Sequence, residues 1–325
     1  MRIDEWTAIW LATKVDLRPS SRVRLEGILR EHLLPEFGNV PLNRVSNADI
    51  RKWIAGMINQ RYSPATVRKA FIALAQIMRA AVSDRRIAFN PCQDVPLPPE
   101  RHLEQRFLSA TEVEMLADAI EPRFRALVLL ASYGGLRFGE LAGLRRSRVD
   151  SVRSRISVID TLIEANGELV SGPPKTRRSI RTVPLPRRVM RELESHLRQY
   201  AENSPESLVF SGPKGGPLRR AGFRRSWWKP AVLAVGLSGL KFHELRHTFV
   251  ALWIAAGANP KEVSVRAGHS SVAFTLDRYG HLYEDLQDEV PDRLDTLLSV
   301  LSSPGTRATD WLRYVGDTPV RVRRH

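Results

Sequence analysis

The sequence contains one cysteine, Cys92, among 325 residues. A single thiol cannot form an internal disulfide or supply most of a thiolate metal site, which fits a reducing compartment. No run of about 18 apolar residues is present that could cross a bilayer, and the first residues do not resemble a cleavable signal peptide. These absences argue against a disulfide scaffold and a transmembrane protein. They predict a soluble, cytoplasmic chain with no membrane partner.

Acidic residues are also scarce relative to basic ones. Asp and Glu together number 35 against 50 Lys and Arg, which gives a formal charge of +15 and a pI near 10.6. Each Lys or Arg set against a phosphate releases condensed counterions, so this excess favours nucleic acid as the partner. The basic residues are spread along the chain and do not form a polybasic tail beside an amphipathic anchor, which disfavours an anionic membrane. No Asp/Glu cluster indicates a Mg²⁺ site, and we expect neither metal nor other cofactor.

The chain divides at a proline-rich stretch. From Trp6 to about Phe89, apolar residues recur at spacings of three and four, as in packed helices, and Ser63 and Pro64 are typical of the start of the longest one. Asn90–Pro99 contains four prolines in ten residues and predicts an extended connection. The expected parts are a helical domain at 1–90, a linker at 91–103, a second domain at 104–301 and a tail at 302–325.

The second part combines helices with short strands. Ser109 or Thr111 can cap its first helix. Alternation from Arg155 to Ile163, a turn at 166–167 and a further apolar run from Ile180 to Leu185 predict a small antiparallel sheet. Helical sequence resumes from Pro186 onward. The predicted fold class is therefore mainly α with a small antiparallel β-sheet, in two domains.

The segment Phe242–Gly257 predicts an amphipathic helix with three basic side chains in its first turn. His243, Arg246 and His247 are three or four residues apart and share a helix face. Imidazole and guanidinium groups near a helix N-terminus are suited to binding an anion. A hydrogen-bonded surface cluster is the plainer alternative.

The same five residues, HELRH, also fit the H-E-x-x-H pattern of zinc metalloproteases, with Glu244 as the base. Such a site needs a third protein ligand, for which His269 or His281 are candidates. Arg246 would place a fixed positive charge on the ligand face. We therefore keep the zinc metalloprotease as the less favoured alternative.

Three segments resemble the tyrosine recombinase (phage integrase) family. ASYGGLRFGELAGLRRSRVD resembles its first catalytic block, with the family's arginine at Arg137. The second block is similar to the stretch that runs from H-x-x-R at His243 through G-H at His269 to TLDRYGHL at Tyr279. Between them, PPKTRRSIRTVPL places Lys175 where the family has a catalytic lysine. Lys175 is the only lysine between Lys69 and Lys214.

The resemblance implies a two-domain DNA clamp, in which a helical core-binding domain and a catalytic domain grip double-stranded DNA. It implies a site-specific recombinase that cleaves and rejoins strands through a 3′-phosphotyrosine intermediate, as a homotetramer on two sites, and a DNA-bending accessory protein is a possible helper. Integration of phage or mobile-element DNA is favoured over a Xer-like resolution of chromosome dimers. Helical sequence begins almost at Met1, which leaves no room for an additional arm-binding domain, so we expect a short recognition site.

The resemblance also assigns roles. Tyr279 would be the nucleophile, with Arg137 and Arg246 clamping the scissile phosphate and Lys175 protonating the leaving oxygen. His243 would assist proton transfer at Tyr279, and His269 would donate a hydrogen bond to a phosphate oxygen. Glu140 would orient this cluster. Since all six catalytic groups are present, a catalytically silent DNA-binding relative is disfavoured.

Some assignments stay open. Tyr283, four residues after Tyr279, is the rival nucleophile. Trp227 and Trp228 fit a protein core better than DNA stacking, and the isolated histidines are expected at the surface: His32, His102 and His196. Further contacts to DNA are expected from a set of basic residues that would otherwise form a solvated surface: Arg68, Lys69, Arg177, Arg178 and Arg181.

Overall fold

A computed structural model describes residues 1–99, 105–165, 167–172, 179–284 and 294–295 of the chain. The chain separates into two compact units, with Met1–Glu104 forming most of one and the residues from Gln105 onward most of the other. Each unit has its own buried apolar cluster. No helix of the described residues is long and apolar enough to span a bilayer.

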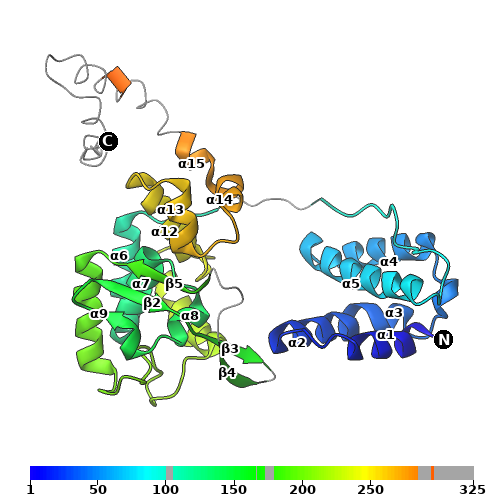
Figure 1. Cartoon of the computed structure of the whole chain (residues 1–325), viewed down its shortest axis with the longest axis horizontal. Coiled ribbons are helices and arrows are strands. Elements are labelled where there is room, and N and C mark those ends of the chain that lie inside the picture. The colour runs from blue at the N-terminus through cyan, green and yellow to red at the C-terminus, as the bar shows by residue number, and fades with distance from the viewer. Residues whose placement is uncertain (100–104, 166, 173–178, 285–293, 296–325) are drawn as a thin grey trace, which may run out of the picture. The chain divides into compact units, whose positions relative to one another are not determined.

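The first unit consists of helices (Figure 1), which confirms the prediction from the spacing of its apolar residues. Its α-helices are α1 (Ile3–Ala12), α2 (Pro19–Ile28), α3 (Leu34–Phe37), α4 (Asn47–Asn59) and α5 (Pro64–Ser83). The longest, α5, begins as expected: the Ser63 side chain accepts a hydrogen bond from the backbone N–H of Thr66, and Pro64 occupies the first helical position. Its apolar face, including Leu74 and Ile77, is fully buried in the unit's core.

The second unit packs helices around a small sheet. Its helices are α6 (Ala110–Ala119), α7 (Arg125–Gly134), α8 (Phe138–Ala142), α9 (Arg187–Tyr200), α10 (Arg220–Phe223), α11 (Lys229–Ala234), α12 (Glu244–Ala255), α13 (Pro260–Ala267), α14 (Val272–Tyr279) and α15 (His281–Glu284). Helix α7 is buried along nearly its whole length and packs against both α6 and α12. This packing places the start of α8 close to α12 and α13.

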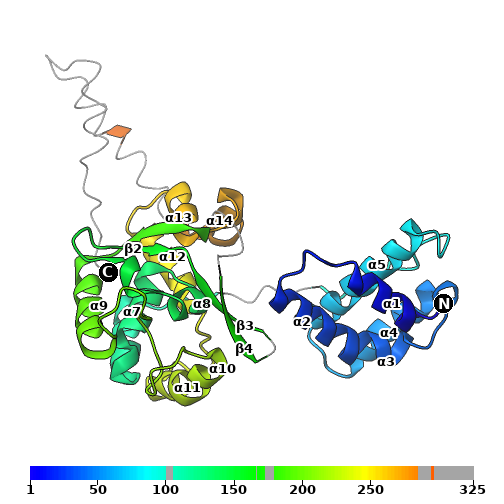
Figure 2. The same cartoon turned by 60° about the horizontal axis from the view of Figure 1, so that its bottom comes forward.

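The strands are antiparallel, as predicted, but they form two sheets. Strands β1 (Val149–Asp150), β2 (Arg155–Val158) and β5 (Arg181–Pro184) pair in the order β1-β2-β5, with Ile156 opposite Val183. Strands β3 (Thr161–Ala165) and β4 (Glu168–Gly172) form a separate hairpin that projects from the helices of the second unit (Figure 2). In β2–β5 register, Val158 faces Arg181, which brings Arg181 to the end of the sheet.

A glycine ends α7 and allows the close approach of α12. Gly135 has φ +66°, in the left-handed region, and a Cβ atom there would lie 2.4 Å from Cδ1 of Phe249 on α12. We expect Gly135→Ala to lower the free energy of unfolding by about 2–4 kcal/mol, because backbone strain and overpacking add. Thermal denaturation of Gly215→Ala is the matched control, since Gly215 also has positive φ but open space at the Cβ position. Equal losses in the two variants would contradict the role of Phe249.

Two side chains of the second unit, His196 and Trp228, are buried. His196, expected at the surface, is buried on α9, and its Nε2 lies 2.7 Å from the carbonyl oxygen of Val209. That surface assignment was wrong, because an isolated histidine gives no sign of which helix face it occupies. Trp228 is buried and donates its indole N–H to the carbonyl of Leu240, so it belongs to the core.

Candidate active site

Arg137 directly precedes α8, and Glu140 lies in the first turn of that helix. The Arg137 backbone N–H donates to Oε2 of Glu140 at 2.9 Å, and the Arg137 guanidinium donates to Oε1 at 2.8 Å. A further N–H of Arg137 donates to the carbonyl of Gly268, at the end of α13. The Arg137 side chain is 39% exposed, whereas that of Glu140 is 2% exposed. The buried Glu140 carboxylate therefore fixes the position of the Arg137 guanidinium, which remains partly exposed to solvent.

A second arginine, Arg181, also binds the Glu140 carboxylate. Arg181 donates to both carboxylate oxygens of Glu140, at 3.1 and 2.9 Å, and its Nε–H donates to the carbonyl of Arg266 at 2.8 Å. From the sequence we expected Arg181 to be exposed and to contact DNA phosphates. Its side chain is 3% exposed, so the sheet register turns it inward to bind Glu140 instead of solvent-facing phosphates.

Arg246 lies at the centre of the same cluster and is buried. It donates to the carbonyl of Gly135 at 2.5 Å and also to the carbonyl of Ala267, so it connects the ends of α7 and α13. Burial and the charges of Arg137 and Arg181 lower the pKa of Arg246 to about 9, which leaves it a cation at pH 7. Burial alone raises the pKa of a carboxyl, but the hydrogen bonds and charge of Arg181, with Arg137 and Arg246, outweigh it and hold the pKa of Glu140 at about 2.

Tyr279 ends α14 and is 1% exposed. Its ring stacks parallel to that of His269, with 6.0 Å between centroids, and lies 6.4 Å from that of Phe107. We expected the nearby cations to ease formation of the phenolate. Burial has the larger effect and raises the pKa of Tyr279 above its ordinary value, although Arg246 and Arg278 act in the opposite direction.

Two histidines, His247 and His269, contact Tyr279, and a third, His243, contacts His247. His247 Nδ1 lies 2.5 Å from the Tyr279 hydroxyl oxygen. His243 precedes α12 and meets the His247 ring edge-on at 5.0 Å, while His269 Nδ1 lies 2.9 Å from the Thr275 hydroxyl. Burial and neighbouring cations lower the pKa of all three imidazoles, to about 4 for His243 and His247 and about 3 for His269. All three are therefore neutral at pH 7.

The structure thus brings together five of the six predicted catalytic residues and the supporting Glu140. Lys175, Arg177 and Arg178 lie outside the described residues. The sequence did not predict two contacts of the site: that of His247 with the Tyr279 hydroxyl, and the hydrogen bonds from Arg181 to Glu140. The sequence contained a signal for the first, since His247 follows His243 by one helical turn.

A zinc site would need His243 and His247 as metal ligands and Glu244 as the base, but Glu244 and His247 have other partners in the structure. The Glu244 carboxylate accepts a hydrogen bond from the backbone N–H of Lys241, at the start of α12. His247 contacts Tyr279, as described above. Within the described part of the chain, no three His, Cys, Asp or Glu side chains converge in a way that could hold a metal ion.

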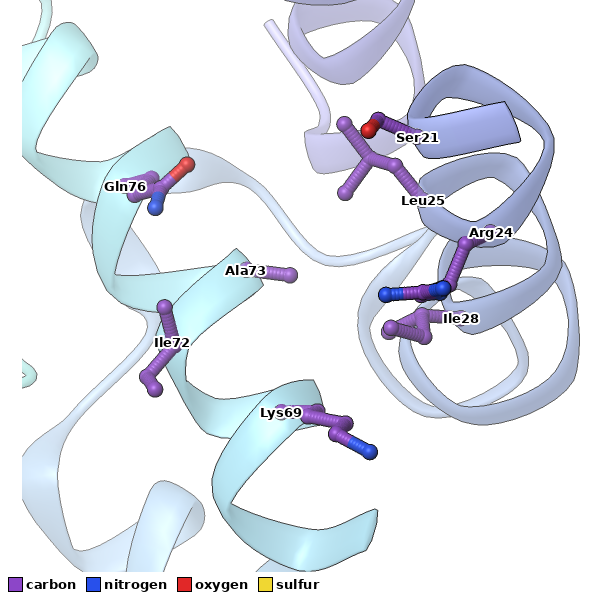
Figure 3. A pocket seen from close by; sticks show the side chains of 8 residues that line it. All are labelled: Ser21, Arg24, Leu25, Ile28, Lys69, Ile72, Ala73 and Gln76. Atoms are coloured by element: carbon purple, nitrogen blue, oxygen red, sulfur yellow. The ribbon is translucent and has the colours of Figure 1, made fainter. Parts of the chain in front are cut away.

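In the first unit, the two basic residues predicted to face DNA occupy different settings. The Nε–H of Arg68 donates to the carbonyl of Pro98, so it fastens the proline-rich stretch to α5. Lys69 and Arg24 extend toward the space between α5 and α2 (Figure 3), in a groove whose lining includes no acidic residue.

Two protein-family models match the sequence of this chain. The family described as "Phage integrase family" matches residues 106–285, and "Phage integrase, N-terminal SAM-like domain" matches residues 3–58. The integrase of Mycobacterium phage L5 is 30% identical over 274 residues, which are 83% of this chain and 72% of that protein.

Two solved structures share the fold. The Tn1549 transposon integrase in complex with transposon right end DNA is 22% identical, with a TM-score of 0.76 over 91% of this chain and all of that one. The lambda integrase tetramer bound to a Holliday junction is 16% identical, with a TM-score of 0.63 over 85% of this chain and 77% of that one.

Proposed function

Since this chain belongs to the phage integrase family, we propose that it cuts and rejoins DNA at specific sites through a covalent 3′-phosphotyrosine at Tyr279. One observation carries the assignment of the nucleophile: the Tyr279 hydroxyl lies 2.5 Å from Nδ1 of His247, and the nearby charge of Arg246 acts to lower the pKa of the phenol. Integration of phage or mobile-element DNA is the function that fits the named relatives. The reaction takes place in the cytoplasm, where such DNA is found.

The roles follow from what phosphodiester cleavage requires. An in-line nucleophile, neutralisation of the phosphate charge and a proton for the leaving 5′ oxygen are all needed. Arg137, with its exposed guanidinium, and Arg246 bind the non-bridging oxygens through permanently charged N–H donors. Lys175 supplies the proton, and His243 and His269 donate hydrogen bonds to the phosphate. Glu140 orients Arg137 by accepting hydrogen bonds from its guanidinium and its backbone N–H.

Both units contact the same duplex in this proposal. Lys69 and Arg24 bind a backbone phosphate in the groove between α2 and α5, which the absence of acidic lining residues supports. Arg177 and Arg178 would follow phosphates beside Lys175. Four protomers act on two sites, as in the lambda integrase tetramer on its junction. An accessory DNA-bending protein stays a prediction.

The proposal is tested with the wild-type protein and a nicked suicide substrate, carrying a site selected from random DNA, in the presence of EDTA. We expect a covalent protein–DNA adduct that resists denaturation, because the phosphotyrosine conserves the bond energy and the arginines replace a metal ion. Mass spectrometry of the attached peptide should place the nucleotide on Tyr279. Attachment at Tyr283, or strand cleavage without any adduct, would overturn the assignment.

A further inference from the structure

The hydroxyl of Tyr279 has one hydrogen-bonding partner among the residues that the structure describes, and that partner is His247. The two side chains come from different helices, α12 and α14, and their contact distance of 2.5 Å is short for a hydroxyl and an imidazole nitrogen. The parallel stack with His269 and the nearby Phe107 ring hold the phenol in place. The hydroxyl is therefore oriented toward Nδ1 of His247.

Among the described residues, neither of the other two histidines hydrogen-bonds to the Tyr279 hydroxyl. His269 uses its Nδ1 on the hydroxyl of Thr275, and its ring plane is parallel to that of Tyr279, at an angle of 3°. His243 meets the His247 ring edge-on, with 5.0 Å between the ring centroids. The position expected for a proton acceptor is thus filled by His247, although the sequence pointed to His243.

The ionisation states match this geometry. A tyrosine with a pKa above its ordinary value of about 10 is less than roughly 0.1% phenolate at pH 7, so attack needs a proton acceptor. Burial, together with His243 and Arg278, lowers the pKa of His247 to about 4, so its ring is neutral and carries a lone pair on one nitrogen. With the ring proton on Nε2, Nδ1 accepts the hydrogen bond from the phenol.

We propose that His247 is the general base of strand cleavage and takes the Tyr279 proton on Nδ1 as the phenol oxygen attacks phosphorus. The Tyr279 O–H bond and the bond from phosphorus to the 5′ oxygen break, while the phenol oxygen forms its bond to phosphorus. The 5′ oxygen leaves with a proton from the acid, Lys175. Resealing runs in reverse, with His247 returning its proton to the departing phenolate. This inference rests on the proposed function, because it requires Tyr279 to be the nucleophile.

The test is single-turnover cleavage of the suicide substrate by His247→Ala and His247→Gln between pH 6 and 9.5. At pH 7 we expect both variants to cleave about 10²–10⁴-fold more slowly than wild type. Their rates should rise nearly tenfold per pH unit as solvent removes the phenol proton, whereas the wild-type rate stays flat. Glutamine keeps a hydrogen bond to the phenol without being a base, so recovery in His247→Gln, or a loss that is equal at every pH, would overturn the proposal.

A second substrate separates base from acid. Replacing the bridging 5′ oxygen by sulfur gives a leaving group that needs no proton, so it should restore cleavage by Lys175→Ala and leave His247→Ala slow. Restoration of cleavage by His247→Ala on the sulfur substrate would place His247 on the leaving-group side.

His281→Ala is the matched control: it removes an exposed imidazole two residues from Tyr279 and should cleave at the wild-type rate. An adduct that forms on Tyr279 with no pH effect at His247 rejects this inference alone, whereas an adduct on another residue rejects the proposed function.

Discussion

Replacing Tyr279 by phenylalanine should abolish the covalent adduct, with a loss of more than about 10⁴-fold in the rate of strand cleavage. Phenylalanine retains the ring that stacks on His269 and packs near Phe107, so the fold and DNA binding should be preserved. The lost atom is the hydroxyl that contacts His247. The measurement is adduct formation on the suicide substrate by denaturing gel, with binding to the same DNA measured in parallel.

Tyr283→Phe is the matched control, since Tyr283 lies on the next helix and its hydroxyl is buried without a hydrogen-bond partner within the described structure. Burial and the charge of Glu262 raise the pKa of Tyr283 to about 12, so very little of it is phenolate at pH 7. We expect adduct formation at the wild-type rate in this variant. If Tyr283→Phe forms no adduct and Tyr279→Phe does, the nucleophile is Tyr283 and not Tyr279.

The helical pattern and the catalytic motifs were readable from the sequence because both depend on local spacing. Leu74 and Ile77 three residues apart on α5 predict a buried helix face, and Arg246 three residues after His243 predicts a shared helix face. The cap of α5 at Ser63 follows from its hydroxyl and the proline after it. Each of these features is determined within one or two helical turns.

The contacts between distant segments were not readable in the same way. Arg181 and Glu140 are separated by 41 residues, and their contact depends on which face of β5 is turned inward. One residue of register shift would place Arg181 on the opposite face, which is the exposed position that we expected. His247 meets Tyr279 only through the packing of α12, α13 and α14. The residue types of the candidate site could therefore be predicted from the sequence, whereas the histidine that contacts the Tyr279 hydroxyl could not.

Replacing Glu140 by glutamine should have the largest effect on stability, lowering the free energy of unfolding by roughly 3–5 kcal/mol. The carboxylate is buried and receives charged hydrogen bonds from Arg137 and Arg181, and Arg246 is close enough to lower its pKa. Without its charge, these cations repel one another in the interior. Chemical denaturation at pH 7 measures the loss. Strand cleavage should fall as well, because Arg137, which we propose binds the scissile phosphate, loses the carboxylate that holds it. Glu206→Gln is the control, since Glu206 pairs with Arg145 but is 68% exposed, and it should cost less than about 1 kcal/mol.

The pH dependence of the stability lost in Glu140→Gln shows whether the carboxylate charge is the cause. The pKa of Glu140 falls from 4.5 to about 2 on folding, so the folded state binds its proton less tightly than the unfolded state. The stabilisation of about 3 kcal/mol that follows is fully present above pH 4.5 and is lost as the pH falls through 2. The difference in stability between wild type and Glu140→Gln should therefore be constant from pH 8 to 5 and narrow below pH 4.5. A difference that stays constant down to pH 3 would show that the shape of the carboxylate, and not its charge, holds the arginines together.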